Sequence, residues 1–141
     1  MSLPHRVFVD TSYFIALLNS RDANHQQAIA IQKQLQEENV IKITSEYVLL
    51  ELGDGLSKLR FRSLASQLIR LVLQDNTFTI IHASTTLFSQ AFSLFENRSD
   101  KEWGMTDCAS IVIMDELNLT VALTADHHFE QAGYQVLLSQ I

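Results

Sequence analysis

Two features of the sequence predict one α/β domain: a three-layer α/β/α sandwich with a central, mainly parallel sheet of about five strands. Short apolar segments with the composition of buried strands alternate with longer amphipathic segments of helical period. This alternation is typical of a parallel sheet that is covered by helices on both faces. The length of 141 residues suits a single domain. We therefore expect one domain over residues 1–141, with residues 1–5 as a flexible start or a cloning remnant.

The first half of the chain is expected to supply two strands. The first, 6–9, is a run of apolar, β-branched and aromatic residues that stops at Asp10. Asp10 and the next two residues, Thr11 and Ser12, have the side-chain oxygens that cap helix N-termini. The second strand is expected at 40–44. Helices with one apolar face are expected at 13–18, 23–38, 45–59 and 63–73.

The second half predicts three more strands, at 78–81, 121–124 and 134–138. A helix over about 85–96 and a polar loop over 97–104 lie between the first two of these strands, followed by a helix that begins near Thr106. This last helix is apolar almost all round. We therefore expect protein to surround it on several sides.

The charge of the chain gives a mixed indication. A net charge of −6 is unusual for a nucleic-acid binder, because phosphate contacts normally come from a basic surface. However, Lys58, Arg60, Arg62 and Arg70 lie in one short stretch, with Phe61 between two of the arginines. A solvated helix face is the simpler interpretation of this stretch. Lys58, Arg60 and Arg62 remain candidate substrate contacts.

Several classes of protein are excluded by what the sequence lacks. No apolar run has the length of a membrane span, and the first residues lack the basic and apolar regions of a signal peptide. We therefore expect a cytoplasmic protein with no membrane partner. The single cysteine, Cys108, excludes an internal disulfide and a cysteine-based zinc site. Its place in a packed helix favours a core residue over a nucleophile.

Four acidic residues form the candidate site. Ligands of open parallel sheets bind beyond the carboxyl ends of the strands. Asp10 directly follows the first predicted strand, Asp126 lies just past the end of the fourth, and Asp107 lies in the first turn of the buried helix, at the same end of the sheet. Successive helix residues are rotated by about 100°, which places Glu51 at the edge of its helix's apolar stripe.

Each acid also has a purely structural interpretation. Asp10, Asp107 and Asp126 suit helix starts and turns, and Glu51 suits a solvated helix position. Together they favour a metal site, because clustered carboxylates repel one another unless a cation compensates them. Oxygen ligands without a histidine or cysteine triad indicate Mg²⁺, with Mn²⁺ as a substitute, rather than zinc.

At these residues the chain resembles the PIN-domain nucleases, and especially the VapC-type toxins of bacterial toxin–antitoxin pairs. The resemblance extends over about 7–138, and the stretch around Trp103, Thr106, Asp107 and Cys108 is its most specific part. The matching motifs are Val9-Asp10-Thr11-Ser12, Glu51-Leu52-Gly53-Asp54-Gly55-Leu56, Asp100 to Ser110, and Thr124-Ala125-Asp126-His127-His128-Phe129. The four acidic positions of the family correspond to Asp10, Glu51, Asp107 and Asp126.

The resemblance implies Mg²⁺-dependent hydrolysis of RNA that leaves 5′-phosphate and 3′-hydroxyl ends. It also implies a cognate antitoxin protein and a homodimer. Asp100 matches a frequent extra acid near the site, although a solvated loop residue is an equal possibility.

We therefore hypothesise that the four acids hold one or two ions, which activate a water molecule and neutralise charge on the phosphate. Asp10 and Asp107 are the expected direct ligands, with Asp126 direct or through water, and Glu51 binds a second ion or helps to take the proton.

Other side chains near the acids are open to two interpretations. Thr11, Ser12 and Thr106 could bind phosphate or water, or serve only as helix caps. His127 and His128 could act as a base or metal ligands, but a pair beside a turn is more often surface or support. Trp103 and Tyr13 could stack on bases, although core packing is favoured for both.

Four alternatives to an active nuclease toxin can be compared with the sequence. A phosphatase with an aspartate nucleophile needs a second aspartate two residues after the first, where Ser12 stands, and a phosphoacceptor domain needs paired acids and a lysine that the sequence does not place. A catalytically weak or silent PIN-like module that binds RNA or protein, and a stand-alone RNA-processing nuclease, remain open.

Overall fold

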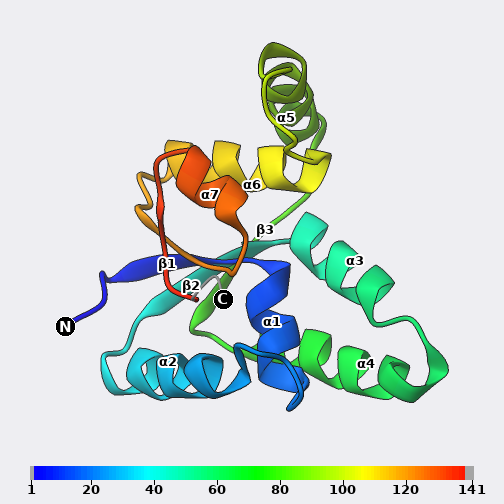
Figure 1. Cartoon of the computed structure of the whole chain (residues 1–141), viewed down its shortest axis with the longest axis vertical. Coiled ribbons are helices and arrows are strands. Elements are labelled where there is room, and N and C mark those ends of the chain that lie inside the picture. Colours follow the sequence, from blue (N-terminus) through cyan, green and yellow to red (C-terminus); the bar gives the residue numbers. More distant parts are fainter. Residues whose placement is uncertain (1, 139–141) are drawn as a thin grey trace.

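A computed structural model describes residues 2–138 and arranges them around one sheet of five strands in the order β3-β2-β1-β4-β5. β1 lies at the centre, between β2 and β4 (Figure 1). All four strand pairings are parallel, so the carboxyl ends of all the strands lie at one edge of the sheet. The strands are β1 (Arg6–Val9), β2 (Ile41–Ser45), β3 (Phe78–Ile81), β4 (Val121–Leu123) and β5 (Gln135–Val136).

Helices cover both faces of this sheet, which confirms the predicted three-layer sandwich. In Figure 1, α1, α2 and α4 lie below the sheet and α5, α6 and α7 lie above it. α3 extends from the carboxyl end of β2. The helices are α1 (Thr11–Leu18), α2 (His25–Glu37), α3 (Glu46–Gly55), α4 (Leu59–Gln74), α5 (Thr85–Asn97), α6 (Met105–Glu116) and α7 (His127–Gln131).

The division between α3 and α4 differs from the prediction. The helix expected over 45–59 ends at Gly55, and α4 begins at Leu59 instead of Ser63. Leu59 is therefore 90% exposed and does not continue the apolar stripe of α3. The low helix propensity of glycine accounts for the early end.

The segment after β4 also differs from the prediction. α7 was not expected, because five residues are too few to show a helical period. The strand expected over 134–138 is reduced to the two residues of β5. α7 matters for the site because Asp126 is its N-cap residue.

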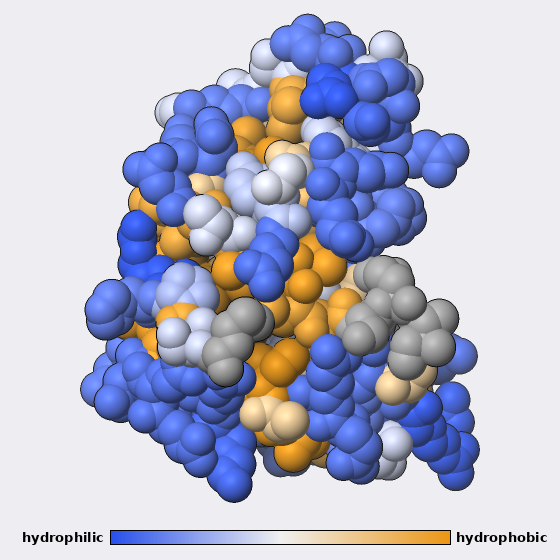
Figure 2. Space-filling model, turned by 60° about the vertical axis from the view of Figure 1, so that its left-hand side comes forward, coloured by the Kyte–Doolittle hydropathy of each residue, from blue (hydrophilic) through white to orange (hydrophobic). Residues whose placement is uncertain are grey.

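The central layer is apolar. Val7, Phe8 and Val9 of β1 have no exposed surface, as expected for a central strand covered on both faces. Figure 2 shows apolar side chains gathered in a band across the middle of one face, between hydrophilic regions above and below. Leu3 packs against this core, and its backbone N–H donates to Glu38 Oε1 (2.8 Å). Within residues 2–138, no helix is long and apolar enough to cross a bilayer.

Candidate active site

Three of the four candidate acids are placed at the carboxyl edge of the sheet by the ends of their elements. Asp10 lies between β1 and α1, and its backbone N–H donates to the carbonyl of Leu123 at the end of β4 (3.1 Å). Asp126 follows β4, and Asp107 lies in the first turn of α6. Because β1 and β4 are neighbours in the sheet, Asp10 and Asp126 reach the same edge.

A relay of hydroxyl groups fixes the carboxylate of Asp10. Thr124 Oγ1 donates to Asp10 Oδ2 (2.9 Å) and accepts a hydrogen bond from the backbone N–H of Asp126 (3.0 Å). Ser12 Oγ lies 2.9 Å from Thr124 Oγ1 and accepts from the backbone N–H of Ala125 (2.9 Å). Since Thr124 donates its only hydroxyl proton to Asp10, the hydroxyl group of Ser12 must donate to Thr124 Oγ1. The relay therefore points its protons toward Asp10.

Asp10 is an unusual carboxyl group because it is only 5% exposed. Burial, with smaller contributions from the negative charges of Asp107 and Glu51, raises its pKa from 3.8 to about 7, although the hydrogen bonds from Thr124 and from the backbone of Thr11 act to lower it. The electrostatic influence of Asp107 and Glu51 means that both lie close to Asp10. A group with this pKa and these neighbours favours a compensating positive charge.

Glu51 is held beside Asp10 by the residue that follows Asp10 in the chain. Thr11 Oγ1 donates to Glu51 Oε1 (2.7 Å). Thr11 itself is buried, whereas Glu51 is exposed on α3. The bond therefore brings a solvent-facing carboxylate from α3 to the start of α1.

His128 links the remaining two acids. Its Nδ1 lies 3.1 Å from Asp107 Oδ2 and 3.2 Å from Asp126 Oδ1. Asp126 Oδ1 also accepts from the backbone N–H of His128 (2.9 Å), and Asp107 Oδ2 accepts from the backbone N–H of Gly104 (3.0 Å). The second pair of acids is thus held by α7 and by the N-terminus of α6.

The two histidines differ, which the sequence did not indicate. His127 has 63% of its side chain exposed, while His128 has 19% exposed and contacts two acids. His127 therefore lies at the surface and His128 supports two of the acids, which are the two roles expected for such a pair. One ligand atom from each of Asp126, His127 and His128 lies within 4.8 Å of the others, but three consecutive residues at a helix start are close for reasons of chain geometry alone. Thr124 is a site residue that sequence analysis missed, and only its place beside the acidic motif pointed to it.

Other predicted contacts lie outside this cluster. Thr106 is half-buried and lines a small apolar hollow with Tyr47 and Phe88. Lys58 precedes α4, and Arg60 and Arg62 are in its first turn, where they line two different hollows. The structure does not bring these three basic residues into contact with the acids.

Asp100 is occupied by cations. Arg98 donates to both of its carboxylate oxygens (3.0 and 3.1 Å), and Lys101 Nζ lies 3.6 Å away. The bonds from Arg98, together with the nearby positive charges, lower its pKa to about 2. Arg98 also lies over the ring of Trp103, 4.9 Å from its centroid. The contacts of Asp100 are thus those of a loop ion pair.

The expected core residues near the site are buried. Trp103 is 5% exposed, and its Nε1–H donates to Gln131 Oε1 (3.0 Å). Tyr13 and Cys108 are 2% and 0% exposed. Core packing, rather than base stacking or nucleophilic chemistry, is what these surroundings support.

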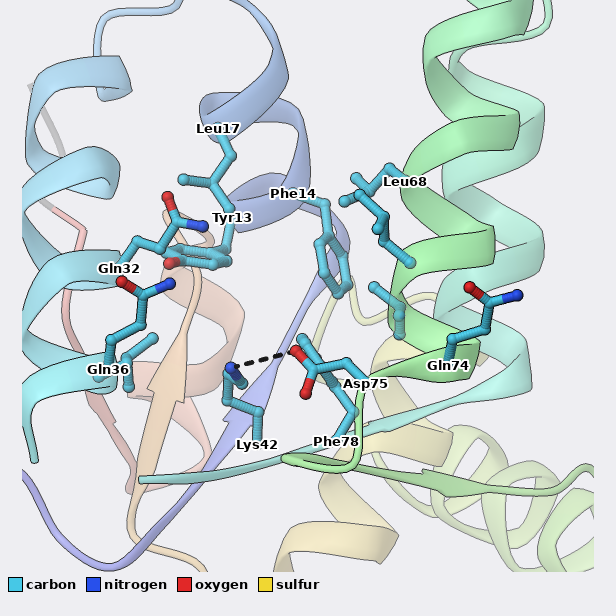
Figure 3. A pocket seen from close by; sticks show the side chains of 13 residues that line it. Tyr13, Phe14, Leu17, Gln32, Gln36, Lys42, Leu68, Gln74, Asp75 and Phe78 are labelled. Atoms are coloured by element: carbon cyan, nitrogen blue, oxygen red, sulfur yellow. Dashed lines mark ion pairs between the residues drawn. The ribbon is translucent and has the colours of Figure 1, made fainter. Parts of the chain in front are cut away.

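A separate apolar cavity of about 360 Å³ lies away from the acids. It is enclosed by α1, α2 and α4, with Tyr13, Phe14 and Phe78 among its walls (Figure 3). Lys42 and Asp75 form an ion pair there (4.0 Å). Lys42 is near the amino end of β2, and Phe78 begins β3, so this cavity belongs to the end of the sheet opposite the acids.

Comparison with known proteins agrees with this fold. Residues 7–133 match the PIN domain family. Because the match covers most of the chain, the protein belongs to the PIN domain family. The match includes all four acidic residues.

The chain is similar to one relative over most of its length. The chain is 27% identical over 130 residues to the 23S rRNA-specific endonuclease VapC20 of Mycobacterium tuberculosis, covering 91% of this chain and 95% of the relative. The crystal structure of that protein, described as a sarcin-ricin loop cleaving toxin, superposes with a TM-score of 0.78 over the same shares.

Two further structures support the fold alone. FitAcB from Neisseria gonorrhoeae has a TM-score of 0.65 at 19% identity, with 93% of this chain and 96% of that chain covered. VapBC2 from Rickettsia felis, bound to a DNA fragment from its promoter, has a TM-score of 0.65 at 16% identity over the same shares.

Proposed function

We propose that this protein is a divalent-metal-dependent endoribonuclease that hydrolyses phosphodiester bonds at the site formed by Asp10, Glu51, Asp107 and Asp126. The observation that carries the proposal is the buried carboxyl group of Asp10, whose pKa is raised to about 7 in the presence of Asp107 and Glu51. The similarity to an endonuclease named for 23S rRNA supports RNA as the substrate class.

The donor set fits Mg²⁺, with Mn²⁺ as a substitute. Carboxylate oxygens are the ligands that hard divalent cations prefer, and the mutual repulsion of Asp10, Asp107 and Glu51 is relieved by a cation. We assign Asp10 and Asp107 as direct ligands, Asp126 as a direct or water-mediated ligand, and Glu51 as a ligand of a second ion or a proton acceptor. When bound, the ion lowers the pKa of a water molecule and neutralises charge on the phosphate.

The protein's own groups orient the acidic side chains and exclude water from Asp10. Thr124 and Ser12 keep Asp10 in one rotamer, because the hydroxyl relay leaves its carboxylate one favourable position. Burial of Asp10 keeps competing water away from it. Thr11 holds Glu51 at the solvent-facing side of the cluster, where a carboxylate can take a proton from an attacking water. Thr11 and Ser12 donate their hydroxyl protons to Glu51 and Thr124, so we assign them to positioning the acids rather than to contacting phosphate. Thr106 lines an apolar hollow and has no such role.

Cleavage of a labelled RNA tests this proposal. We expect cleavage with Mg²⁺ or Mn²⁺, none with a chelator, and a loss of about 10²-fold or more in Asp10→Asn, since that change removes a ligand and a charge. Asp115→Asn is a matched control, because Asp115 is exposed near the other end of α6. Undiminished cleavage by Asp10→Asn would refute the assignment.

The silent-module alternative makes a different prediction in the same experiments. It predicts no carboxylate-dependent binding of Mn²⁺ by calorimetry and no cleavage under any condition. An active nuclease binds Mn²⁺, and Asp10→Asn weakens this binding.

We further propose that the protein is the toxin of a toxin–antitoxin pair and acts in the cytoplasm. The chain covers 95% of a relative that is described as a toxin. The apolar cavity between α1, α2 and α4 gives a cognate antitoxin protein a recess for an apolar side chain (Figure 3). Expression with and without the neighbouring gene tests this. Growth arrest that the neighbour relieves supports a toxin, whereas harmless expression supports a stand-alone RNA-processing nuclease.

We also propose a homodimer that forms through α5. Phe88, Phe92 and Phe95 are 53%, 46% and 45% exposed and lie at helical spacing on that helix, and such a row is costly in water. Phe92→Glu should convert a dimer to a monomer in light scattering after size-exclusion chromatography. A wild-type monomer at micromolar concentration would contradict the proposal.

A further inference from the structure

The acidic cluster continues into a surface stripe between α1 and α3. Thr11 and Ile15 lie one turn apart on α1, and Glu51 and Gly55 lie one turn apart on α3. The two helices meet at both levels: Thr11 bonds to Glu51 (2.7 Å), and a Cβ on Gly55 would lie 4.0 Å from Ile15 Cδ1. Glu51 and Gly55 are both exposed, so this stripe faces solvent.

The stripe leads into a basic hollow. Leu18 and the residues after it, Asn19, Ser20 and Arg21, form one wall, and Arg60 and Phe61 of α4 form another. The hollow has a volume of about 640 Å³, and none of the described residues that line it is acidic. Arg21 and Arg60 are exposed. This positive surface lies directly beyond a negative site.

Arg60 also has the geometry to contact a base. Its guanidinium lies over the ring of Phe61, 4.6 Å from the centroid. This cation–π contact holds the guanidinium group in one orientation. RNA bases stack on guanidinium planes as well as on aromatic rings. Asn19 and Ser20 beside it supply hydrogen-bonding groups that are able to reach sugar or phosphate.

We propose that this hollow is a subsite for the RNA strand, holding nucleotides a short distance along the strand from the cleaved bond, with Arg21 and Arg60 on phosphates. The inference rests on the proposed nuclease function. From Thr11 to Leu18 the helix rises about 10 Å at ~1.5 Å per residue. A stacked strand rises ~3.4 Å per nucleotide, so the hollow lies about three nucleotides from the acids. A negatively charged strand that leaves the metal site along this stripe would meet the compensating charges of Arg21 and Arg60 there.

The same geometry separates Arg60 from its neighbour in sequence. Arg62 lines a different hollow with Arg70, between α3 and α4. Neither residue is among those that line the basic hollow. The basic stretch of α4 therefore does not act as one surface, and Arg70 provides a control of equal charge.

Binding of a fluorescein-labelled single-stranded RNA of twelve nucleotides, measured by anisotropy, tests the subsite. The full-length chain carries Asp10→Asn, so that cleavage does not disturb the measurement. To this background are added Arg21→Gln, Arg60→Gln, both together, or Arg70→Gln. All of these are exposed positions, and thermal unfolding confirms that each variant is folded.

Each subsite substitution should raise the Kd about fivefold, which is the effect expected when one exposed charge contact is lost. The double variant should also reduce the slope of log K against log salt by about 1.4, since each phosphate contact on a single strand contributes ~0.7. Arg70→Gln should change the Kd less than twofold.

A double variant that binds RNA as tightly as its parent would overturn the subsite, whatever it does to binding of a protein partner. An equal loss in Arg70→Gln would overturn it too, because general charge attraction would then explain the effect. Failure of the nuclease proposal shows separately, as absent cleavage by the wild-type chain with metal.

Discussion

Replacing Asp10 by asparagine should stabilise the metal-free protein while it removes the activity. Asn keeps the shape of the side chain and can still accept the hydrogen bond of Thr124. It cannot carry the charge that burial makes unfavourable at this position. The active site would thus be held together at the expense of stability, as is common where function demands clustered charge.

The size of this effect follows from the pKa of Asp10. The pKa is 3.8 in an unfolded chain and about 7 in the folded protein, a difference equivalent to about 4 kcal/mol. Because the pKa is raised on folding, the folded state keeps a proton that the unfolded state loses between about pH 4 and pH 7. The free energy of unfolding therefore falls as the pH rises through this interval, and the full penalty is present above pH 7.

Urea denaturation in the presence of a chelator, at pH 5 and pH 8, measures this penalty. The free energy of unfolding of Asp10→Asn should exceed that of the wild type by up to about 4 kcal/mol at pH 8 and by markedly less at pH 5. Asp115→Asn should show no such pH-dependent difference. Saturating Mn²⁺, at a hundred times its Kd, should stabilise only the wild type, by about 2.7 kcal/mol. An Asp10→Asn advantage that is the same at both pH values would refute the reasoning.

Three further outcomes are expected. His128→Ala should weaken Mn²⁺ binding in calorimetry by about 10–100-fold, because it releases the two aspartates that the ring bridges, and His127→Ala should not. Thr124→Val removes a bond that lowers the pKa of Asp10, so the acidic limb of the pH–rate profile should move to higher pH; an unmoved limb would argue against the relay. Cys108→Ala should retain full cleavage activity and lose only about 1 kcal/mol in urea denaturation, since the thiol is a buried core group.

Much of the fold was predictable because its signals are local. The apolar run before Asp10 and the nearly all-apolar helix after Thr106 indicate buried elements by composition alone. The alternation of such elements predicts a parallel sheet, and the structure confirms it. The end of α3 at Gly55 was not predicted, because helix ends depend on small differences in propensity and on tertiary contacts.

The candidate site was predictable in part for the same reason. In a parallel sheet the carboxyl ends of the strands share one edge, so the positions of Asp10 and Asp126 just after strands were enough to place them there. Glu51 was harder to place, since a residue in mid-helix has no such rule. Its bond to Thr11 depends on how α1 packs against α3.

The sequence by itself determined the α/β class, the acidic residues and the edge of the sheet to which three of them belong. Only the tertiary structure decided that His128 joins Asp107 to Asp126, and that Arg60 and Arg62 line different hollows. The physical reason is that strand ends and apolar periods are properties of one segment. A hydrogen bond between side chains of two elements depends on how those elements pack together. The same packing decides which hollow a helix residue lines.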